Sequence, residues 1–219
     1  MLGEIMKNGT CFQIYVALCI VLLSSFSVFA HLSSEVTIGT QVWTSKNLDV
    51  STFRNGEAIP EAKNAEEWAK AGKNKTAAFC YYEYDIKNDK VYGKLYNWYA
   101  VNDSRGLAPQ GYHIPSDAEW TILTDFLGGS KISGKKMKSK DGWSDDGNGD
   151  NSSGFNGLPG GNCNDDGSFG IVAESGYWWS SSERLTDDAW YRSLGNDRTR
   201  VGRGTNYKNN GFSVRCLRD

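Results

Sequence analysis

The chain has only two histidines and four prolines among its 219 residues, and it has no Cys-x-x-Cys pair. So few histidines make histidine-based catalysis hard to build, and the cysteine spacing supports neither a zinc knuckle nor a thioredoxin-like redox site. Basic residues (24) and acidic residues (26) nearly balance, giving a formal net charge of −2. Because nucleic-acid binding depends mostly on neutralising phosphates, no nucleic-acid partner is expected.

The chain has instead 25 glycines and 13% aromatic residues. This composition indicates many turns around a core rich in Trp and Tyr, rather than disorder. The length fits one large domain or two small ones, and no repeat or linker divides the chain after its N-terminal segment. We therefore expect one domain over residues 31–219.

The N-terminal segment indicates export. Residues 14–30 carry no charge, follow Lys7, and end in Val28-Phe29-Ala30, with small residues where a signal peptidase requires them. This pattern predicts a signal peptide over residues 1–30, with the mature protein secreted or held at the cell surface or outer membrane. The alternative is an uncleaved anchor, because about 17 apolar residues are at the lower limit for a spanning helix. Any membrane contact is expected through this segment alone.

Cleavage would leave three cysteines, Cys80, Cys163 and Cys216. An oxidising compartment permits one disulfide among them, and the sequence does not choose the pair.

Local signals predict a hairpin and two helices. Two β-rich runs flank Gly39-Thr40 within residues 36–43, which is typical of a tight hairpin. Ser116-Asp-Ala-Glu119 is a capping box, and the apolar spacing after it predicts a helix over residues 117–127. A shorter helix is expected over residues 64–72, with Gly72 as its stop.

The rest of the chain is expected to be loops and short strands. Residues 131–170 are rich in Gly, Asn, Asp and Ser, and a loop of this length inside a domain is usually functional. Runs of strand length follow at residues 177–181, 189–194 and 211–217. In the last run Phe212, Val214 and Cys216 alternate with Ser213 and Arg215, so the first three should share the core face. The fold class expected is α+β.

Several motifs give the chain a recognisable pattern, above all GYHIPSDAEW at residues 111–120 and GFSVRC at residues 211–216. The others, in chain order, are residues 36–43, 92–98, 158–161, 167–170 and 177–181. With these motifs the chain resembles the Fibrobacter succinogenes major paralogous domain. That resemblance implies an exported bacterial protein of a family common in Bacteroidetes and Fibrobacteres.

Two of these motifs are also similar, more remotely, to the formylglycine-generating enzymes. That similarity implies a C-type-lectin-like fold, in which N- and C-terminal strands pair and long loops project from one side. Those enzymes bind copper through a cysteine pair in their C-terminal part, whereas this chain has a single cysteine, Cys216, after Cys163. Family members often have a cysteine where this chain has Ala108. Because the chain lacks the copper-binding cysteine pair, we expect no catalytic residues and no catalysis.

An aromatic cluster is the first candidate ligand site. Adjacent strand residues point to opposite faces, so one of Trp178 and Trp179 should be buried, leaving the other free to be exposed. Exposed aromatics near Tyr191 and Arg192 would suit sugar stacking or a protein partner, as would the loop residue Trp143. The alternative is that core and loops cover both tryptophans.

Calcium is the one cofactor candidate. Asn162-x-Asn164-x-Asp166-Gly167 places oxygen side chains at alternating positions before a glycine, as calcium loops do. Asp146-x-Asn148-x-Asp150 repeats the alternation without the glycine. The alternative is that these residues simply form turns.

Two further residue types have structural explanations. His113 is expected to be a hydrogen-bonded structural histidine, and Asp117 and Glu119 fit capping of the helix that follows. The function expected is therefore an exported binding or adhesion module for an unidentified surface glycan or protein. The alternatives are a divergent formylglycine-generating-type enzyme and a structural surface protein without a small ligand.

Overall fold

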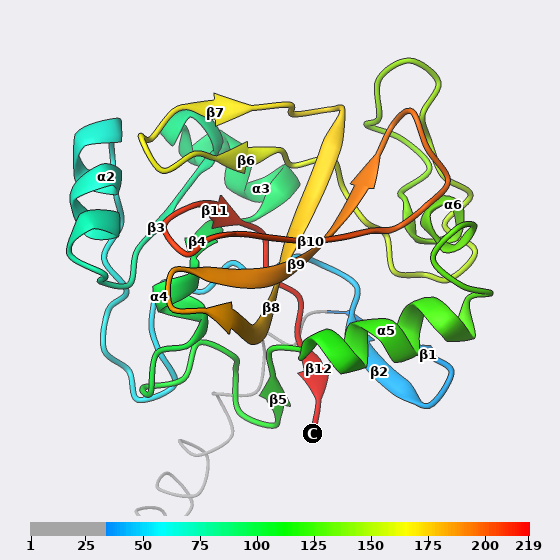
Figure 1. Cartoon of the computed structure of the whole chain (residues 1–219), viewed down its shortest axis with the longest axis horizontal. Coiled ribbons are helices and arrows are strands. Elements are labelled where there is room, and N and C mark those ends of the chain that lie inside the picture. The colour runs from blue at the N-terminus through cyan, green and yellow to red at the C-terminus, as the bar shows by residue number, and fades with distance from the viewer. Residues whose placement is uncertain (1–33) are drawn as a thin grey trace, which may run out of the picture. The chain divides into compact units, whose positions relative to one another are not determined.

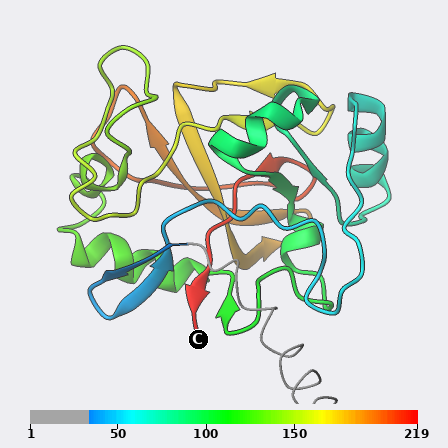
Figure 2. The ribbon, with the colours of Figure 1, turned by 180° about the vertical axis from the view of Figure 1, so that it is seen from behind.

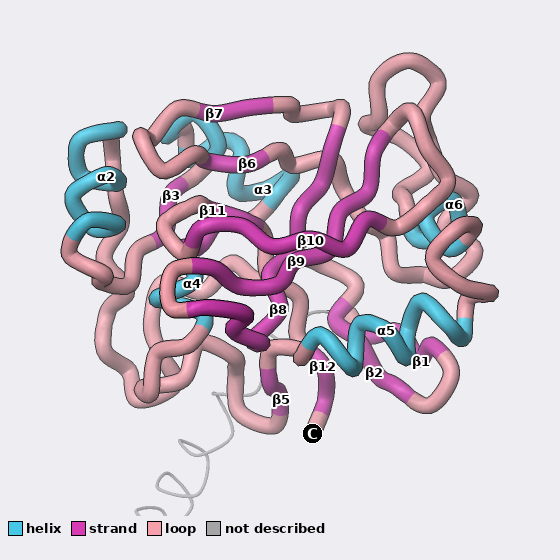
Figure 3. Tube along the Cα trace, viewed as in Figure 1, coloured by secondary structure: helices cyan, strands magenta, loops and turns pink. Residues whose placement is uncertain are grey.

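The computed structural model describes residues 34–219, so the predicted signal peptide lies outside the described residues. Residues 34–219 form a strand-rich α+β fold with mostly antiparallel sheets and few helices (Figure 1). Much of this part of the chain is loop, as Figure 3 shows. Within it, no helix is both long and apolar enough to cross a membrane.

The strands form three sheets. The terminal sheet has the order β1 (Glu35–Ile38), β2 (Gln41–Thr44), β12 (Leu217–Arg218), β5 (Tyr112–His113). The central sheet has the order β10 (Gly202–Tyr207), β9 (Asp188–Gly195), β8 (Ser175–Leu185). The five-stranded sheet has the order β3 (Phe79–Cys80), β4 (Leu95–Asn97), β11 (Gly211–Phe212), β6 (Asn162–Cys163), β7 (Phe169–Gly170).

Short helices connect the sheets, and Figure 2 shows them from behind. The α-helices are α2 (Ala65–Lys73), α3 (Asp89–Tyr92), α4 (Trp98–Val101), α5 (Asp117–Phe126) and α6 (Ser133–Met137). The 3₁₀ turns are η1 (Tyr82–Tyr84) and η2 (Ile86–Asn88).

The predicted hairpin is confirmed as β1 and β2, which pair antiparallel around Gly39 at φ 64°. Leu217 of β12 pairs with Trp43 of β2, so strands from the two ends of the described chain lie side by side. The sequence resemblance implied this pairing of N- and C-terminal strands.

Both predicted helices are present. α5 has the full capping box, in which Ser116 and Glu119 exchange side-chain and backbone hydrogen bonds. At α2 the Asn64 side chain accepts from the Glu67 backbone N–H at 2.9 Å. The prediction that Gly72 stops this helix is wrong: Gly72 is buried inside it, where a Cβ would lie 2.8 Å from Asn209. Close packing, rather than a helix stop, requires glycine there.

The C-terminal run departs from the single strand expected. It divides into β11 and β12, which belong to different sheets. Phe212, Val214 and Cys216 lie in the core as predicted, but Ser213 and Arg215 on the opposite side are also buried. The loop around Phe155 covers that side, because two backbone carbonyls of the loop accept hydrogen bonds from Arg215.

The three cysteines are buried free thiols in the described part of the chain. Cys80 and Cys163 belong to one hydrophobic cluster, and Cys216 belongs to another. Two effects raise the pKa of the Cys80 thiol: burial, which is the larger, and its contact with Cys163. Burial raises the pKa of Cys216 to about 12, so this thiol is protonated at neutral pH.

Cys216 should therefore react slowly with a bulky thiol reagent in the native protein. Only the thiolate is nucleophilic, and the side chain is 0% exposed. Mass spectrometry of the labelled protein checks this, with labelling in denaturant as the positive control. Rapid native labelling of Cys216 would contradict its place in the core.

Candidate ligand-binding site

Of the two alternatives for Trp178 and Trp179, the one in which core and loops cover both is confirmed. Both side chains are buried, Trp178 to 1% exposure and Trp179 to 0%. They do point to opposite faces of β8, but each face has its own core cluster. Trp178 packs against Phe155, and Trp179 packs against Phe212. Neither indole is therefore accessible to a ligand in this structure.

Trp143 is also buried, at 5% exposure, although it lies in a loop. Its indole N–H donates to the Ser139 hydroxyl at 2.9 Å, and the Lys138 ammonium lies 5.3 Å from the ring centroid. The loop thus supplies its own small core, and Trp143 lacks the exposed ring that its expected role in ligand contact requires. This cation–π contact helps to hold the Lys138 side chain in place.

Tyr191 and Arg192 are consecutive residues of β9. Tyr191 is half-buried, whereas Arg192 is 2% exposed and donates to Asp117 at 2.6 Å. Asp117 also accepts from Arg203 at 2.7 Å, and Arg203 stacks on Trp190 with 3.6 Å to the centroid. Burial works against the charge of Asp117, but the two arginines outweigh it and lower its pKa.

The residues of the calcium hypothesis form the β6–β7 hairpin. Asn162 donates to the Asn164 side chain at 2.7 Å, and Asn164 donates to the Ser168 hydroxyl at 2.9 Å. Asp166 accepts from the Ser168 backbone at 2.8 Å. These side chains therefore serve the turn, and calcium binding by them stays a prediction. Within residues 34–219, no group of three His, Cys, Asp or Glu side chains could hold a metal.

His113 is hydrogen-bonded through both ring nitrogens, as expected of a structural histidine. Its Nε2 lies 2.9 Å from Glu119 and its Nδ1 lies 2.8 Å from Asp219. Burial works against the charged ring, but the two carboxylates outweigh it and raise the pKa of His113. The His113 ring thus ties the start of α5 to Asp219.

The histidine should contribute stability that depends on pH. Because its folded-state pKa is raised, this contribution is fully present below the unfolded pKa and is lost as pH rises through the folded pKa. The free energy of unfolding of His113→Gln should therefore differ most from wild type at about pH 5 and least at about pH 9. Urea unfolding at the two pH values measures this. A difference that grows with pH would contradict the ion-pair geometry.

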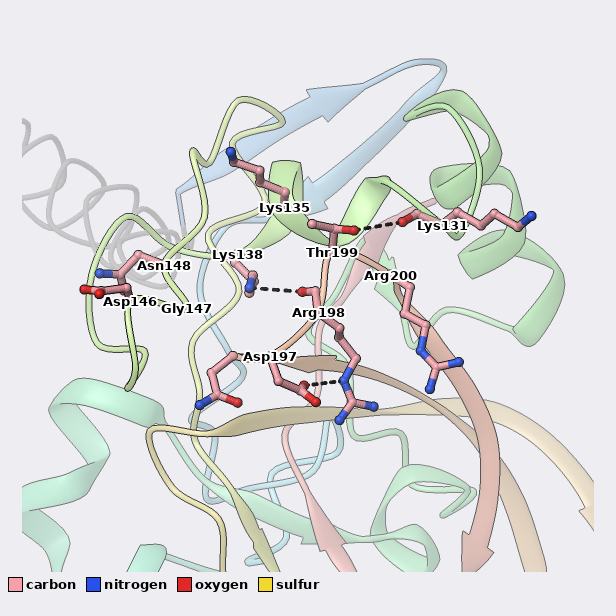
Figure 4. A pocket seen from close by; sticks show the side chains of 11 residues that line it. Lys131, Lys135, Lys138, Asp146, Gly147, Asn148, Asp197, Arg198, Thr199 and Arg200 are labelled. Carbon is pink, nitrogen blue, oxygen red and sulfur yellow. Dashed lines mark hydrogen bonds and ion pairs between the residues drawn. The ribbon is translucent and has the colours of Figure 1, made fainter.

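A basic hollow of about 590 Å³ is the strongest candidate site on the described surface. Figure 4 shows the residues around it. One wall is α6 and its flanks, the second is the loop at residues 146–148, and the third is the turn at residues 196–200 between β9 and β10. We call this the first hollow.

Glycines let its walls approach closely. A Cβ on Gly134 of α6 would lie 2.6 Å from the Thr199 carbonyl oxygen. A Cβ on Gly147 would lie 2.4 Å from Asn196, whose side chain also donates to the Ser144 hydroxyl at 2.9 Å. Segments far apart in the sequence therefore meet here without side chains filling the gap.

Positive charge dominates the first hollow. Lys138 is 3% exposed and donates to the backbone carbonyls of Gly195 at 3.0 Å and Arg198 at 3.2 Å. Burial lowers its pKa. In Figure 4 the Asp197 carboxylate faces the Arg198 guanidinium, with 2.6 Å between Oδ1 and Nε. The hollow thus contains one ammonium held by backbone carbonyls and one arginine paired with a carboxylate.

The remaining cations of the first hollow are Lys131, Lys135 and Arg200. Within residues 34–219 their side-chain nitrogens make no hydrogen bond or ion pair, and all three side chains are exposed. Like charges gathered around one concavity raise its potential and attract anions. These three residues are therefore available to a ligand.

A second hollow of about 630 Å³ adjoins the first, between α5 and the strands β9 and β10. Lys131, Arg198 and Arg200 line both hollows. Tyr191 and Arg192, two of the five ligand residues expected from sequence, line the second. The structure therefore keeps these two beside a concavity and places the three tryptophans in the core.

Sequence reasoning missed the lysines. Residues 131–140 contain five lysines in ten positions, which is a visible signal in a chain of nearly balanced charge. The lysines alone do not predict the first hollow, because the arginines that complete it come from residues 198–200, more than 50 positions later.

These observations define a strand-rich α+β domain with a basic concave surface. A family model described as the Fibrobacter succinogenes major domain matches residues 36–218, so the chain belongs to this family. A search of curated proteins and of solved structures finds no match.

Proposed function

We propose that this protein is an exported binding module that acts at the cell surface or outside the cell, and that its ligand occupies the first hollow. The observation that supports this most is the group of exposed cations formed by Lys131, Lys135 and Arg200, whose side chains make no ion pair within residues 34–219. A volume of about 590 Å³ is typical of ligand sites, which generally range over about 300–1,000 Å³. The ligand class is a glycan or a protein of the surrounding surface.

We further propose that the fold is C-type-lectin-like. The pairing of β2 with β12 and the long loop segment between α5 and β8 support this. In such an arrangement the paired ends form a base, and the loops are free to carry a binding site.

A binding screen tests the function. The protein expressed from the complete chain is applied to arrays of neutral and charged glycans and of surface proteins. The variant Lys131→Ser/Arg200→Ser should weaken the strongest interaction about tenfold or more, since both cations face both hollows. Lys46→Ser is the matched control, because Lys46 is exposed and lines neither hollow. Equal loss in the control would contradict the placement.

The two alternatives predict other results. A formylglycine-generating-type enzyme needs a reactive thiol, so copper-dependent oxidation of a cysteine substrate would support it. A structural surface protein would bind no probe and would assemble with itself. Either outcome, with silent arrays, would replace the proposal.

A further inference from the structure

We infer that the ligand is an acidic polysaccharide, and that its chain lies across both hollows with Arg200 at their junction. This inference rests on the proposed function and adds the chemical class of the ligand. Three observations carry it: the charge of the two hollows, the polar groups between the charges, and the continuity of the surface.

The positive charge of the lining favours an anionic ligand. The cations that line the two hollows are Lys131, Lys135, Lys138, Arg192, Arg198, Arg200 and Arg203. The acidic side chains that line them are Asp125, Asp146 and Asp197. Even with Asp117 counted, which pairs with Arg192 and Arg203 without lining either hollow, seven cations face four carboxylates in a chain whose net charge is −2. Arginine forms bidentate hydrogen bonds with carboxylates, so uronate groups suit Arg200.

The polar groups between the charges favour a sugar over a nucleic acid. Asn148, Asn196 and Thr199 line the first hollow, and Thr124, Ser130 and Ser193 line the second. Amides and hydroxyls both donate and accept, as sugar hydroxyls require. Single-stranded nucleic acids usually need several aromatic stacking surfaces. Tyr191 is the only aromatic side chain lining either hollow in the described surface.

The continuity of the two hollows favours a polymer. Three residues line both hollows, so a ligand that fills one also borders the other. A chain with repeated negative charges can contact Lys135 at one end of this surface and the β9 side at the other. Linked contacts of this kind raise affinity with ligand length until both hollows are covered.

The experiment compares one polymer with and without its charge. Isothermal titration calorimetry of the complete chain uses polygalacturonate, its fully methyl-esterified form, galacturonate oligomers of increasing length, and a single-stranded DNA oligonucleotide. We expect binding to polygalacturonate, affinity that rises with oligomer length, and loss of binding to the ester. A sulfated polysaccharide serves as a second acidic probe.

Single-site variants locate the interaction. Arg200→Ser and Lys135→Ser should each weaken polygalacturonate binding about three- to tenfold, because each removes one exposed charge from the lining. Lys140→Ser is the matched control, since Lys140 is exposed in the same lysine-rich segment but lines neither hollow. Circular dichroism verifies that every variant is folded.

The outcomes separate the two proposals. Equal binding of the ester, weakened by Arg200→Ser, would overturn the acidic ligand and leave the binding module in place. Binding of the oligonucleotide but of neither acidic polymer would overturn both. Binding of no acidic polymer would overturn the inference, and the array screen with Lys131→Ser/Arg200→Ser would then decide the proposed function independently.

Discussion

Replacing Arg215 with methionine is expected to reduce the free energy of unfolding by at least about 3 kcal/mol. The guanidinium is fully buried and donates to the Asn47 side chain and to the backbone carbonyls of Thr44 and Phe155, each at 2.7 Å. No carboxylate pairs with it among the described residues. Methionine would fill part of the volume and leave these buried acceptors without a donor. Urea unfolding followed by tryptophan fluorescence measures the loss.

Arg218→Met is the control for this measurement. Arg218 lies three residues later, and its side chain is 59% exposed with a long contact of 3.5 Å to Glu35. Its replacement should change stability by no more than about 0.5–1 kcal/mol. Arg215→Lys extends the test, because lysine keeps the charge but cannot reach all the acceptors at once. Similar small losses for Arg215→Met and Arg218→Met would show that the buried hydrogen bonds contribute little.

Trp178→Ala should be comparably severe, with an expected loss of about 3–5 kcal/mol. The indole packs edge-on against Phe155 and donates from Nε1 to Asn47 at 2.9 Å. Alanine would leave a large cavity and remove one donor from a buried amide. Chemical denaturation measures the loss, and binding of polygalacturonate by the folded fraction should be unchanged.

Trp190→Ala provides the comparison on the neighbouring strand. Trp190 is half-buried, and its ring is stacked by Arg203, so its loss should cost about 1 kcal/mol. Trp178 and Arg215 donate to the same Asn47 oxygen, so their combined replacement should be non-additive. A folded, stable Trp178→Ala that has lost ligand binding would instead restore this tryptophan as a contact residue.

Local signals predicted the elements whose formation depends on nearby residues. The capping box at Ser116 and the glycine turn at Gly39 each act within a few positions, so the sequence alone identifies α5 and the first hairpin. The family motifs likewise indicated the domain that the family model matches.

Burial on both sides of a strand was harder to predict. Alternation correctly separated Trp178 from Trp179 and Arg215 from Cys216, but it says nothing about what covers the second face. At Trp178 and Arg215 that cover comes from the loop containing Phe155, at a large distance along the chain. The first hollow escaped prediction for the same reason, since its cations come from segments that meet only in the folded protein.

The hydrogen bond from Arg215 to Asn47 also constrains when the protein can complete its fold. The two residues are separated by 168 positions, and β2 obtains its neighbour β12 only from residues 217–218. The Asn47–Arg215 hydrogen bond and the pairing of β2 with β12 therefore cannot form until residues 215–218 have been synthesised, although β1 and Trp178 offer earlier partners. Contacts of such high sequence separation slow folding. Closure of the terminal sheet around β12 should accordingly be a late step of folding, after the β1–β2 hairpin and the β8–β9–β10 sheet have their local partners.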